Sequence, residues 1–294
     1  MRNNYSRRPT VGVVGLGIMG GAMAEAFLEA GYTVHGYDPV TAAAERLKRA
    51  GGRPLASARE VAEHTDVVIT CLATSKALAA VAREIAAAPR GKRVVIEMST
   101  LPLADKQHAK RELARKGIVA LDCPVSGTAV RLKQRAWTIF VSGDARACRR
   151  VDPLLQVLAD ARPYVGAYGN GTRMKFVANH LVAILNVASA EALLLGKRMG
   201  LDVRRVLEVF GPSAVVGTGV LRLRGAMMAK RRYRPATMKV EVWQKDMRII
   251  GEMARRAGAP TPLFNACAPI FSAALRQGYG DADTASVYEV LSSR

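Results

Sequence analysis

The chain has 294 residues, half of them hydrophobic, which is enough for one large domain or two ordinary domains with packed cores. Its four cysteines are scattered and its four histidines show no metal-ligand spacing, so we expect neither disulfides nor a metal centre. A formal net charge of +20 predicts a solvated basic surface, with an anionic substrate or nucleic-acid binding as alternatives.

The first ten residues are polar and basic and lack the apolar core of a signal peptide, so we expect a frayed tail. No apolar run reaches the roughly 20 residues that a membrane span requires. No helix-turn-helix, zinc-finger or RNP-like string accompanies the basic charge. We therefore expect a cytoplasmic protein whose partners include neither a membrane nor nucleic acid.

The most informative segment is a glycine-rich turn near the start of the chain. Residues 11–14 are apolar or glycine and predict a buried strand, the pattern Gly15-x-Gly17-x-x-Gly20 follows at once, and residues 22–30 predict a helix. In this context the pattern is typical of a dinucleotide-binding turn. Gly15 permits the tight turn, Gly17 lets the diphosphate approach the backbone, and Gly20 lets the helix pack closely on the strand. The free N–H groups of the helix N-terminus then face the phosphates.

A second strand over residues 33–37 ends in Asp38, about where the acid that binds the ribose 2′-hydroxyl falls in such units. A carboxylate at this place repels a 2′-phosphate. Asp38 is followed by Pro39 and has no adjacent arginine. We therefore expect NAD as the cofactor, with NADP as the alternative.

Strand-like and helix-like segments alternate up to about residue 166 and then give way to helices. This alternation predicts an α/β fold with a Rossmann-like, doubly wound, mostly parallel sheet. We expect a dinucleotide-binding domain over residues 1–166 and an all-helical domain over residues 167–294, for substrate binding and oligomerisation, that opens with a long helix. Ligands of such sheets bind beyond the carboxyl ends of the strands, so the active site is expected between that edge and the long helix. The later predicted strands are 67–71, 93–97, 119–121, 137–141 and 163–165, and the helices 75–88, 103–116, 145–159 and 172–199.

One segment after the strand at 119–121 is a candidate anion site. It runs from Asp122 to Thr128 and ends in Ser126-Gly127-Thr128. Backbone N–H groups and hydroxyls in such a turn can bind a carboxylate, although a simple turn is the alternative.

The long helix carries three polar residues on one face. Lys175, Asn179 and Asn186 fall at i, i+4 and i+11 in an otherwise apolar helix. Buried polar groups are costly unless they meet a partner or a cavity, although Lys175 could also reach solvent. A lysine desolvated near a cofactor can have its pKa lowered enough to exchange protons near neutrality. The apolar remainder of the helix predicts a homodimer or homotetramer.

Taken together, these motifs resemble the β-hydroxyacid dehydrogenases, the family of 3-hydroxyisobutyrate dehydrogenase, tartronate semialdehyde reductase and 6-phosphogluconate dehydrogenase. The resemblance covers nearly the whole chain. It implies an NAD(P)-dependent oxidoreductase for a short 3-hydroxy acid or the matching semialdehyde. The motifs that carry it are Gly15 to Gly20, Glu97-Met-Ser99-Thr100, Asp122 to Gly127, Gly169 to Asn179, Lys245-Asp246 and Gly280 to Ser286.

The resemblance also implies residue roles. Lys175 would be the general acid/base and Asn179 would assist it. The substrate carboxylate would be bound by Ser126, Gly127 and Thr128, with Lys245 reaching the same pocket. The implied cofactor-binding positions are Gly15, Gly17, Ile18, Met19, Gly20, Asp38, Leu72, Thr100 and Lys245.

The chain departs from the family pattern after Gly127, where Thr128, Leu132 and Arg135 replace smaller residues and glycines. The segment from Arg131 to Arg135 is bulky and cationic, so a second anionic group on the substrate is one hypothesis and plain surface charge the other. The sequence does not predict which hydroxy acid is the substrate. There are two alternative functions. One is imine reduction on the same fold, and the other is a catalytically retired protein that binds a dinucleotide or nucleic acid. The presence of Lys175 weighs against both.

Overall fold

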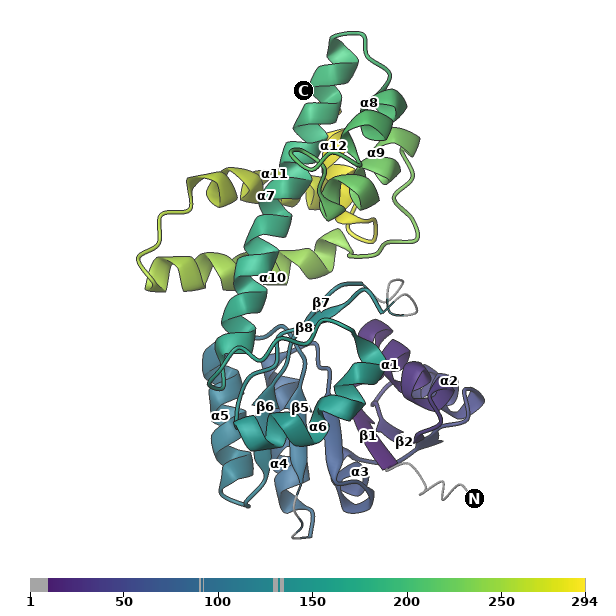
Figure 1. The fold of residues 1–294 in the computed structure, drawn as a ribbon, viewed down its shortest axis with the longest axis vertical. Helices are drawn as coiled ribbons and strands as arrows, with labels where there is room; N and C mark the ends of the chain where they lie inside the picture. The colour runs from purple at the N-terminus through teal and green to yellow at the C-terminus, as the bar shows by residue number, and fades with distance from the viewer. Residues whose placement is uncertain (1–9, 90, 92, 129–131, 133–134, 294) are drawn as a thin grey trace. The chain divides into compact units, whose positions relative to one another are not determined.

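The computed structural model describes residues 10–89, 91, 93–128, 132 and 135–293. These residues form two compact units, one ending at Lys175 and the other beginning at Phe176. The first unit contains a six-stranded sheet with helices on both faces, and the second is helical (Figure 1). The prediction of a Rossmann-like sheet followed by helices is confirmed.

The main sheet is entirely parallel and has the strand order β3-β2-β1-β4-β5-β6. The order reverses between β1 and β4, so the crevice that binds ligands in open α/β sheets opens at the carboxyl ends of these two strands. Its strands are β1 (Thr10–Val14), β2 (Thr33–Tyr37), β3 (Arg53–Pro54), β4 (Val67–Thr70), β5 (Val94–Glu97) and β6 (Val119–Asp122).

Both faces of the central strands are buried, which explains why β1, β4 and β5 are nearly continuous apolar runs. Val13 of β1 packs in one core cluster and its neighbour Val14 in the cluster on the opposite face. The helices that contribute to the first cluster are α1 (Ile18–Glu29), α2 (Thr41–Arg49) and α6 (Ala145–Leu158); those of the second are α3 (Ala58–His64), α4 (Ser75–Ala87) and α5 (Leu103–Ala114).

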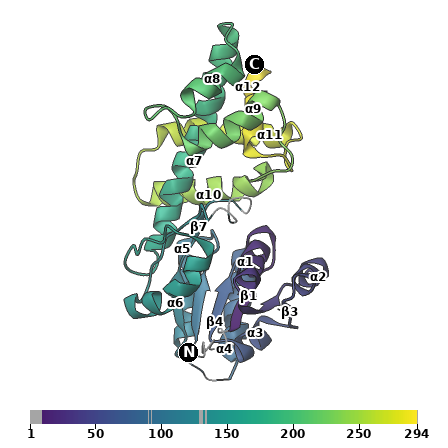
Figure 2. The same ribbon diagram turned by 45° about the vertical axis from the view of Figure 1, so that its right-hand side comes forward.

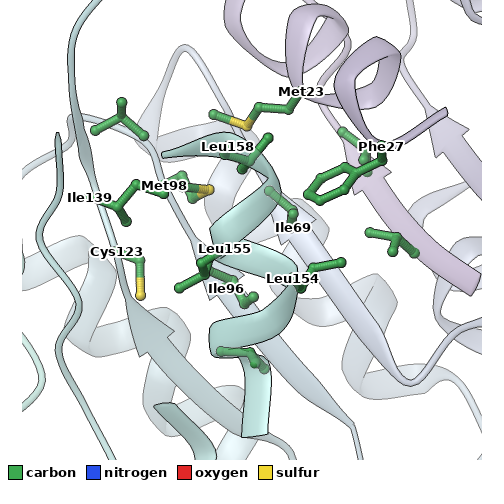
Figure 3. Packing of buried hydrophobic residues seen from close by; sticks show 14 of the residues in the cluster. Met23, Phe27, Ile69, Ile96, Met98, Cys123, Ile139, Leu154, Leu155 and Leu158 are labelled. Carbon is green, nitrogen blue, oxygen red and sulfur yellow. The ribbon is translucent and has the colours of Figure 1, made fainter. Parts of the chain in front are cut away.

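Helix α6 closes one face of the sheet. Figure 3 shows its residues Leu154, Leu155 and Leu158 among Ile69 and Ile96 of the central strands. Burying one such side chain stabilises the fold by about 1.5–3 kcal/mol relative to leaving it in water.

The sequence predictions for residues 137–141 and 163–165 are wrong in part. Only Thr138–Ile139 (β8) forms a strand, which pairs antiparallel with Val125–Ser126 (β7) outside the main sheet. Tyr164 makes a single isolated bridge to Val141. Pro163 has no N–H to extend that ladder, so no strand forms there.

The second unit is built around the long helix α7 (Asn170–Arg198), which starts in the first unit. Phe176, Ala183 and Leu193 of α7 pack in one core cluster with residues of the later helices. Helices α8 and α9 and the C-terminal α12 lie beside the C-terminal half of α7 (Figure 2). These helices are α8 (Val203–Phe210), α9 (Ala226–Lys230), α10 (Val240–Arg256), α11 (Pro262–Arg276) and α12 (Val287–Ser292), with a π-helical turn at Leu221–Gly225 (η2) and a 3₁₀ turn at Thr284–Ser286 (η3).

By length and composition, α7 could cross a membrane, because its most apolar window has a mean hydropathy of 1.5. The sequence contains no uninterrupted apolar run of that length, but the helical window meets the criterion. A core helix of a soluble protein meets it equally. Phe176, Ala183, Val187 and Leu193 of α7 are buried in the core of the second unit, and 39% of the apolar window is buried in all.

Candidate active site

The glycine turn follows β1 directly and has the geometry that a diphosphate needs. Gly15 has a φ of 90°, and a Cβ at this residue would lie 2.3 Å from the carbonyl oxygen of Cys71. A Cβ on Gly20 would lie 1.8 Å from the carbonyl oxygen of Gly15, whereas one on Gly17 would meet no atom within 4 Å. Two of the three glycines are therefore required by packing, and the third leaves the backbone open to a ligand.

Helix α1 begins immediately after Gly17, which contributes no side-chain cap. The first N–H groups of a helix have no partner within it, so this end suits a phosphate group. Ile18 is largely exposed, and Met19 is half-buried against the core. These residues fit the diphosphate of a dinucleotide.

Asp38, the predicted ribose ligand, lies at the end of β2 beside the glycine turn. Its Oδ2 accepts the N–H of Leu16 at 2.7 Å and its Oδ1 the N–H of Val40 at 2.9 Å. A carboxylate has about four lone-pair sites, so it can accept further hydrogen bonds from a ligand. Arg46 of α2 also reaches this turn, where its Nη2 donates to the carbonyl oxygen of Leu16 at 3.3 Å. The sequence analysis considered only residues adjacent to Asp38 and therefore did not identify Arg46.

Leu72 and Thr100, two further predicted cofactor positions, follow β4 and β5 at the same edge of the sheet and are both half-buried. The backbone N–H of Leu72 donates to Ser99 Oγ at 2.8 Å. The N–H of Ser99 in turn donates to Glu97 Oε1 at 2.9 Å. These bonds hold the two loops together beside the turn.

The predicted anion-binding turn is braced by one tryptophan. Gly127 has a φ of 150°, and a Cβ there would lie 2.4 Å from Cδ1 of Trp137. The indole N–H of Trp137 donates to the carbonyl oxygen of Thr128 at 2.7 Å. Among the described residues, the buried Thr128 Oγ1 has no hydrogen-bond partner, and Ser126 is half-buried. An orphaned hydroxyl at the base of a turn suits a polar ligand.

Replacing Gly127 with alanine is expected to destabilise the first unit by about 2–5 kcal/mol, because backbone strain and displacement of Trp137 add together. Gly117→Ala is the matched control, since Gly117 also has a positive φ of 72° but a Cβ there meets no atom within 4 Å. Denaturant unfolding measures both variants. Equal losses of stability would contradict the bracing role of Trp137.

Cys123, next to Asp122, belongs to the core and not to the chemistry. It is buried in the cluster on the α6 face of the sheet. Burial raises the pKa of its thiol well above the ordinary range, so the thiol stays protonated and cannot act as a nucleophile.

The start of α7 is fastened to the end of β6. The N–H of Thr172 donates to Asp122 Oδ2 at 2.8 Å and its hydroxyl to Asp122 Oδ1 at 2.7 Å. Gly171 packs so closely that a Cβ there would lie 2.5 Å from the carbonyl oxygen of Asp122. Lys175 follows one turn later and is 8% exposed. This lysine is therefore desolvated and lies on an anchored turn.

A fully buried lysine supports this anchor, and the sequence analysis did not identify it. Lys106 of α5 is 0% exposed, and its Nζ lies 2.6 Å from Glu97 Oε2 and 2.7 Å from Asp122 Oδ1. Its position among apolar residues of the helix could have identified it from the sequence. Lys106 shares the buried face of α5 with Leu103, Ala109 and Leu113, where an unpaired lysine would be costly.

In the second unit, the predicted polar residues of α7 have different partners. Asn179 is 4% exposed, and its Nδ2 donates to Asp246 Oδ2 at 2.9 Å. The Nζ of Lys245 lies 3.5 Å from Asp246 Oδ1. Asn186 donates instead to the carbonyl oxygen of Thr284 at 3.0 Å, and so fastens the C-terminal motif.

The cationic segment after Gly127 is described only in part, because Arg131 lies outside the described residues. Arg135 forms an ion pair with Asp160 at 2.6 Å and donates to the carbonyl oxygen of Gln156 at 2.8 Å. Leu132 is buried in the core. The guanidinium of Arg135 therefore has protein partners at the end of α6.

Comparison with known proteins covers both units. A family model described as the NAD binding domain of 6-phosphogluconate dehydrogenase matches residues 10–168. A second, described as NAD-binding of NADP-dependent 3-hydroxyisobutyrate dehydrogenase, matches residues 169–291.

Individual relatives match over nearly their full length. An L-threonate dehydrogenase of Cupriavidus necator is 32% identical over 285 residues, which is 96% of this chain and 95% of that protein. A 2-hydroxy-3-oxopropionate reductase of Escherichia coli is 29% identical, with 96% of each chain covered. The structure of Mycobacterium tuberculosis 3-hydroxyisobutyrate dehydrogenase with L-serine superposes with a TM-score of 0.86 at 27% identity, covering 97% of this chain and 99% of that one.

Proposed function

Since this chain belongs to the β-hydroxyacid dehydrogenases of the 6-phosphogluconate dehydrogenase superfamily, we propose that it oxidises a short 3-hydroxy acid, or reduces the matching semialdehyde, with Lys175 as the general acid/base. The observation that carries this proposal is the environment of Lys175. Its side chain is almost fully buried, and the turn that bears it is hydrogen-bonded to Asp122, in the same segment as the Ser126–Thr128 turn.

In the proposed reaction, residues of this chain transfer the proton. A bound nicotinamide dinucleotide supplies the hydride acceptor or donor. In the oxidation, the unprotonated amine of Lys175 takes the proton of the substrate hydroxyl, and in the reduction the ammonium returns it. Asn179 lies one helical turn further on and assists by orienting the amine or the substrate hydroxyl. Its own amide is held by Asp246.

Binding and orientation are the tasks of the loops at the edge of the sheet. The turn of Ser126, Gly127 and Thr128 binds the substrate carboxylate through N–H groups and hydroxyls, which fixes the carbon that reacts. Lys245 adds a cation for the same anionic groups. The predicted cofactor residues hold the dinucleotide: Gly15, Gly17, Ile18, Met19, Gly20, Asp38, Leu72, Thr100 and Lys245.

The test is a search for NADH- or NADPH-dependent reduction across methylmalonate, tartronate and succinic semialdehydes, glyoxylate and a cyclic imine. We expect turnover of at least one carboxylate-bearing aldehyde. Turnover of the imine alone would indicate an imine reductase. No turnover together with tight nucleic-acid binding at about 0.15 M salt would indicate a retired binding protein.

For the cofactor, we propose NAD, because the Asp38 carboxylate repels a 2′-phosphate. We expect a higher kcat/KM with NADH than with NADPH, and a loss of about tenfold in NADH affinity in Asp38→Ala. Asp38→Asn is the matched variant, because it keeps an acceptor for the Leu16 N–H and removes the charge. Titration of each dinucleotide measures the effect. A higher kcat/KM with NADPH in the unmodified protein would contradict the proposal.

The position of Arg46 allows a sharper form of this experiment. Its guanidinium lies at the same turn, so removal of the Asp38 charge should leave a cation available to a 2′-phosphate. We expect NADPH affinity to rise in Asp38→Asn and to fall back in Asp38→Asn/Arg46→Met.

We also propose a homodimer or homotetramer. Apolar side chains remain exposed at the end of α7 and on α8, among them Leu195, Met199, Val209 and Phe210. Such groups on neighbouring elements often mark an interface. Light scattering in solution tests the proposal, and a monomeric mass would contradict it.

A further inference from the structure

We infer that Lys106 is a positioning residue for the reaction. It links the loops on the cofactor side of the sheet to the first turn of α7 and thereby sets the place of Lys175. This inference rests on the proposed function, which gives Lys175 its role.

The ammonium of Lys106 joins three segments that are far apart in the sequence. Its Nζ lies 2.6 Å from Glu97 Oε2, 2.7 Å from Asp122 Oδ1 and 2.9 Å from Thr172 Oγ1. The contacts with Asp122 and Thr172 are hydrogen bonds donated by the ammonium, and the contact with Glu97 is an ion pair. Because the side chain is fully buried and surrounded by protein acceptors, it does not contact substrate, and its effect must pass through its partners.

On one side, the network reaches the loops that follow β4 and β5. Glu97 accepts the N–H of Ser99 through its second oxygen, and Ser99 Oγ accepts the N–H of Leu72. Leu72 and the residue after Ser99, Thr100, are proposed cofactor contacts. Lys106 therefore fixes the carboxylate on which these loops depend.

On the other side, the network reaches the helix that carries the proton-transfer lysine. Thr172 accepts from Lys106 and donates to Asp122, and its backbone N–H donates to the same carboxylate. Lys175 follows Thr172 by three residues, so the two lie on adjacent turns of one helix face. A shift of Thr172 would be transmitted directly to Lys175.

Stability alone does not account for a buried cation here. A buried ion pair is often no more stabilising than well-packed apolar residues of similar volume. The neighbours of Lys106 on its face of α5 are Leu103, Ala109 and Leu113, so the site would accept an apolar residue in packing terms. An apolar residue would lack the directional hydrogen bonds to Asp122 and Thr172 and the ion pair with Glu97. We attribute the presence of a lysine at this position to these contacts.

The test uses Thr172→Val, because Lys106→Met leaves two buried carboxylates without their cation and is expected to impair folding. Thr172→Val removes the hydroxyl between Lys106 and Asp122 but keeps the shape of the side chain and the backbone bond. Thr172→Ser restores the hydroxyl. The matched control is Thr65→Val, since Thr65 is also buried and donates to the carbonyl oxygen of Val61 outside this network.

We expect kcat to fall about 10- to 100-fold in Thr172→Val, with the Kd for NADH and the KM for substrate changed by less than about threefold. Thr172→Ser should recover most of kcat. Thr65→Val should lose comparable thermal stability and keep kcat. Normal kcat in Thr172→Val, or an equal loss of kcat in Thr65→Val, would overturn the inference.

A second readout does not depend on turnover. With NADH bound, amide exchange across residues 171–176 and acylation of Lys175, measured by mass spectrometry, should each rise about tenfold in Thr172→Val and not in Thr65→Val. Unchanged exchange and labelling would overturn the inference even in a protein that turns over no hydroxy acid. Absence of turnover in the unmodified protein, with the labelling change present, would count against the proposed function alone.

Discussion

Lys175→Ala is expected to lower kcat by a factor on the order of 10² to 10⁴ and to leave NADH binding intact. Without the amine, the site loses the group proposed to exchange the proton as the hydride moves. The proposed dinucleotide contacts lie in the glycine turn and in the loops after β4 and β5, so we expect its affinity not to depend on this side chain. Steady-state kinetics and NADH titration measure the two effects separately.

Two controls sharpen this prediction. Lys110→Ala removes an exposed lysine from α5 and should keep kcat within about twofold. A small primary amine added to Lys175→Ala should restore part of the activity, because it can enter the space that the side chain leaves. Activity of Lys175→Ala within a few-fold of the unmodified enzyme would mean that another group transfers the proton.

Lys106→Met is expected to reduce the free energy of unfolding by about 3–5 kcal/mol, because Glu97 and Asp122 then remain buried without their cation. For a domain that is stable by about 5–15 kcal/mol, this is a large part of the total. The loss should shrink as the pH falls. A buried carboxylate without a cation has a raised pKa, so protonation relieves the unpaired charge at higher pH than in the unfolded chain.

The control for this variant is an exposed ion pair. Arg59 and Glu63 lie on the surface of α3, with side chains 55% and 31% exposed. Arg59→Met should cost less than about 1 kcal/mol. Urea unfolding at several pH values measures both variants. A loss below about 1 kcal/mol in Lys106→Met, or a loss that does not depend on pH, would contradict the buried-charge interpretation.

The fold could be predicted from sequence where local signals are strong. The run from β1 through Gly15 to α1 combines an apolar strand, a glycine turn and a helix, and the structure has these elements in that order. β3 was not predicted, because two residues, Arg53–Pro54, carry no periodic pattern and pair only through their neighbour β2. The strand predicted over residues 163–165 is reduced to one bridge, because Pro163 has no N–H with which to extend the ladder beyond the bond from Val165 to Val141.

The candidate site could be predicted only where its residues lie in compact motifs. Ser126, Gly127 and Thr128 are adjacent, and Lys175 and Asn179 share one helix face. Their roles stay predictions.

The residues that hold the candidate site in place do so through contacts between segments that are distant in the sequence. Lys106 meets Asp122 and Thr172 over separations of 16 and 66 residues. Trp137 braces Thr128, and Arg46 reaches Leu16 from another helix. Such contacts depend on how the strands are ordered in the sheet, which no local pattern contains.

The most direct test of the central claim is to follow a deuterium label from the nicotinamide. NADH deuterated at C4 of the ring on one face, and separately on the other, is mixed with the protein and the semialdehyde that it reduces best. We expect one of the two labels to appear on the hydroxyl-bearing carbon of the 3-hydroxy acid, and Lys175→Ala to form this labelled product far more slowly. Formation of the product without deuterium from either cofactor, or formation of the labelled product at an unchanged rate in Lys175→Ala, would contradict it.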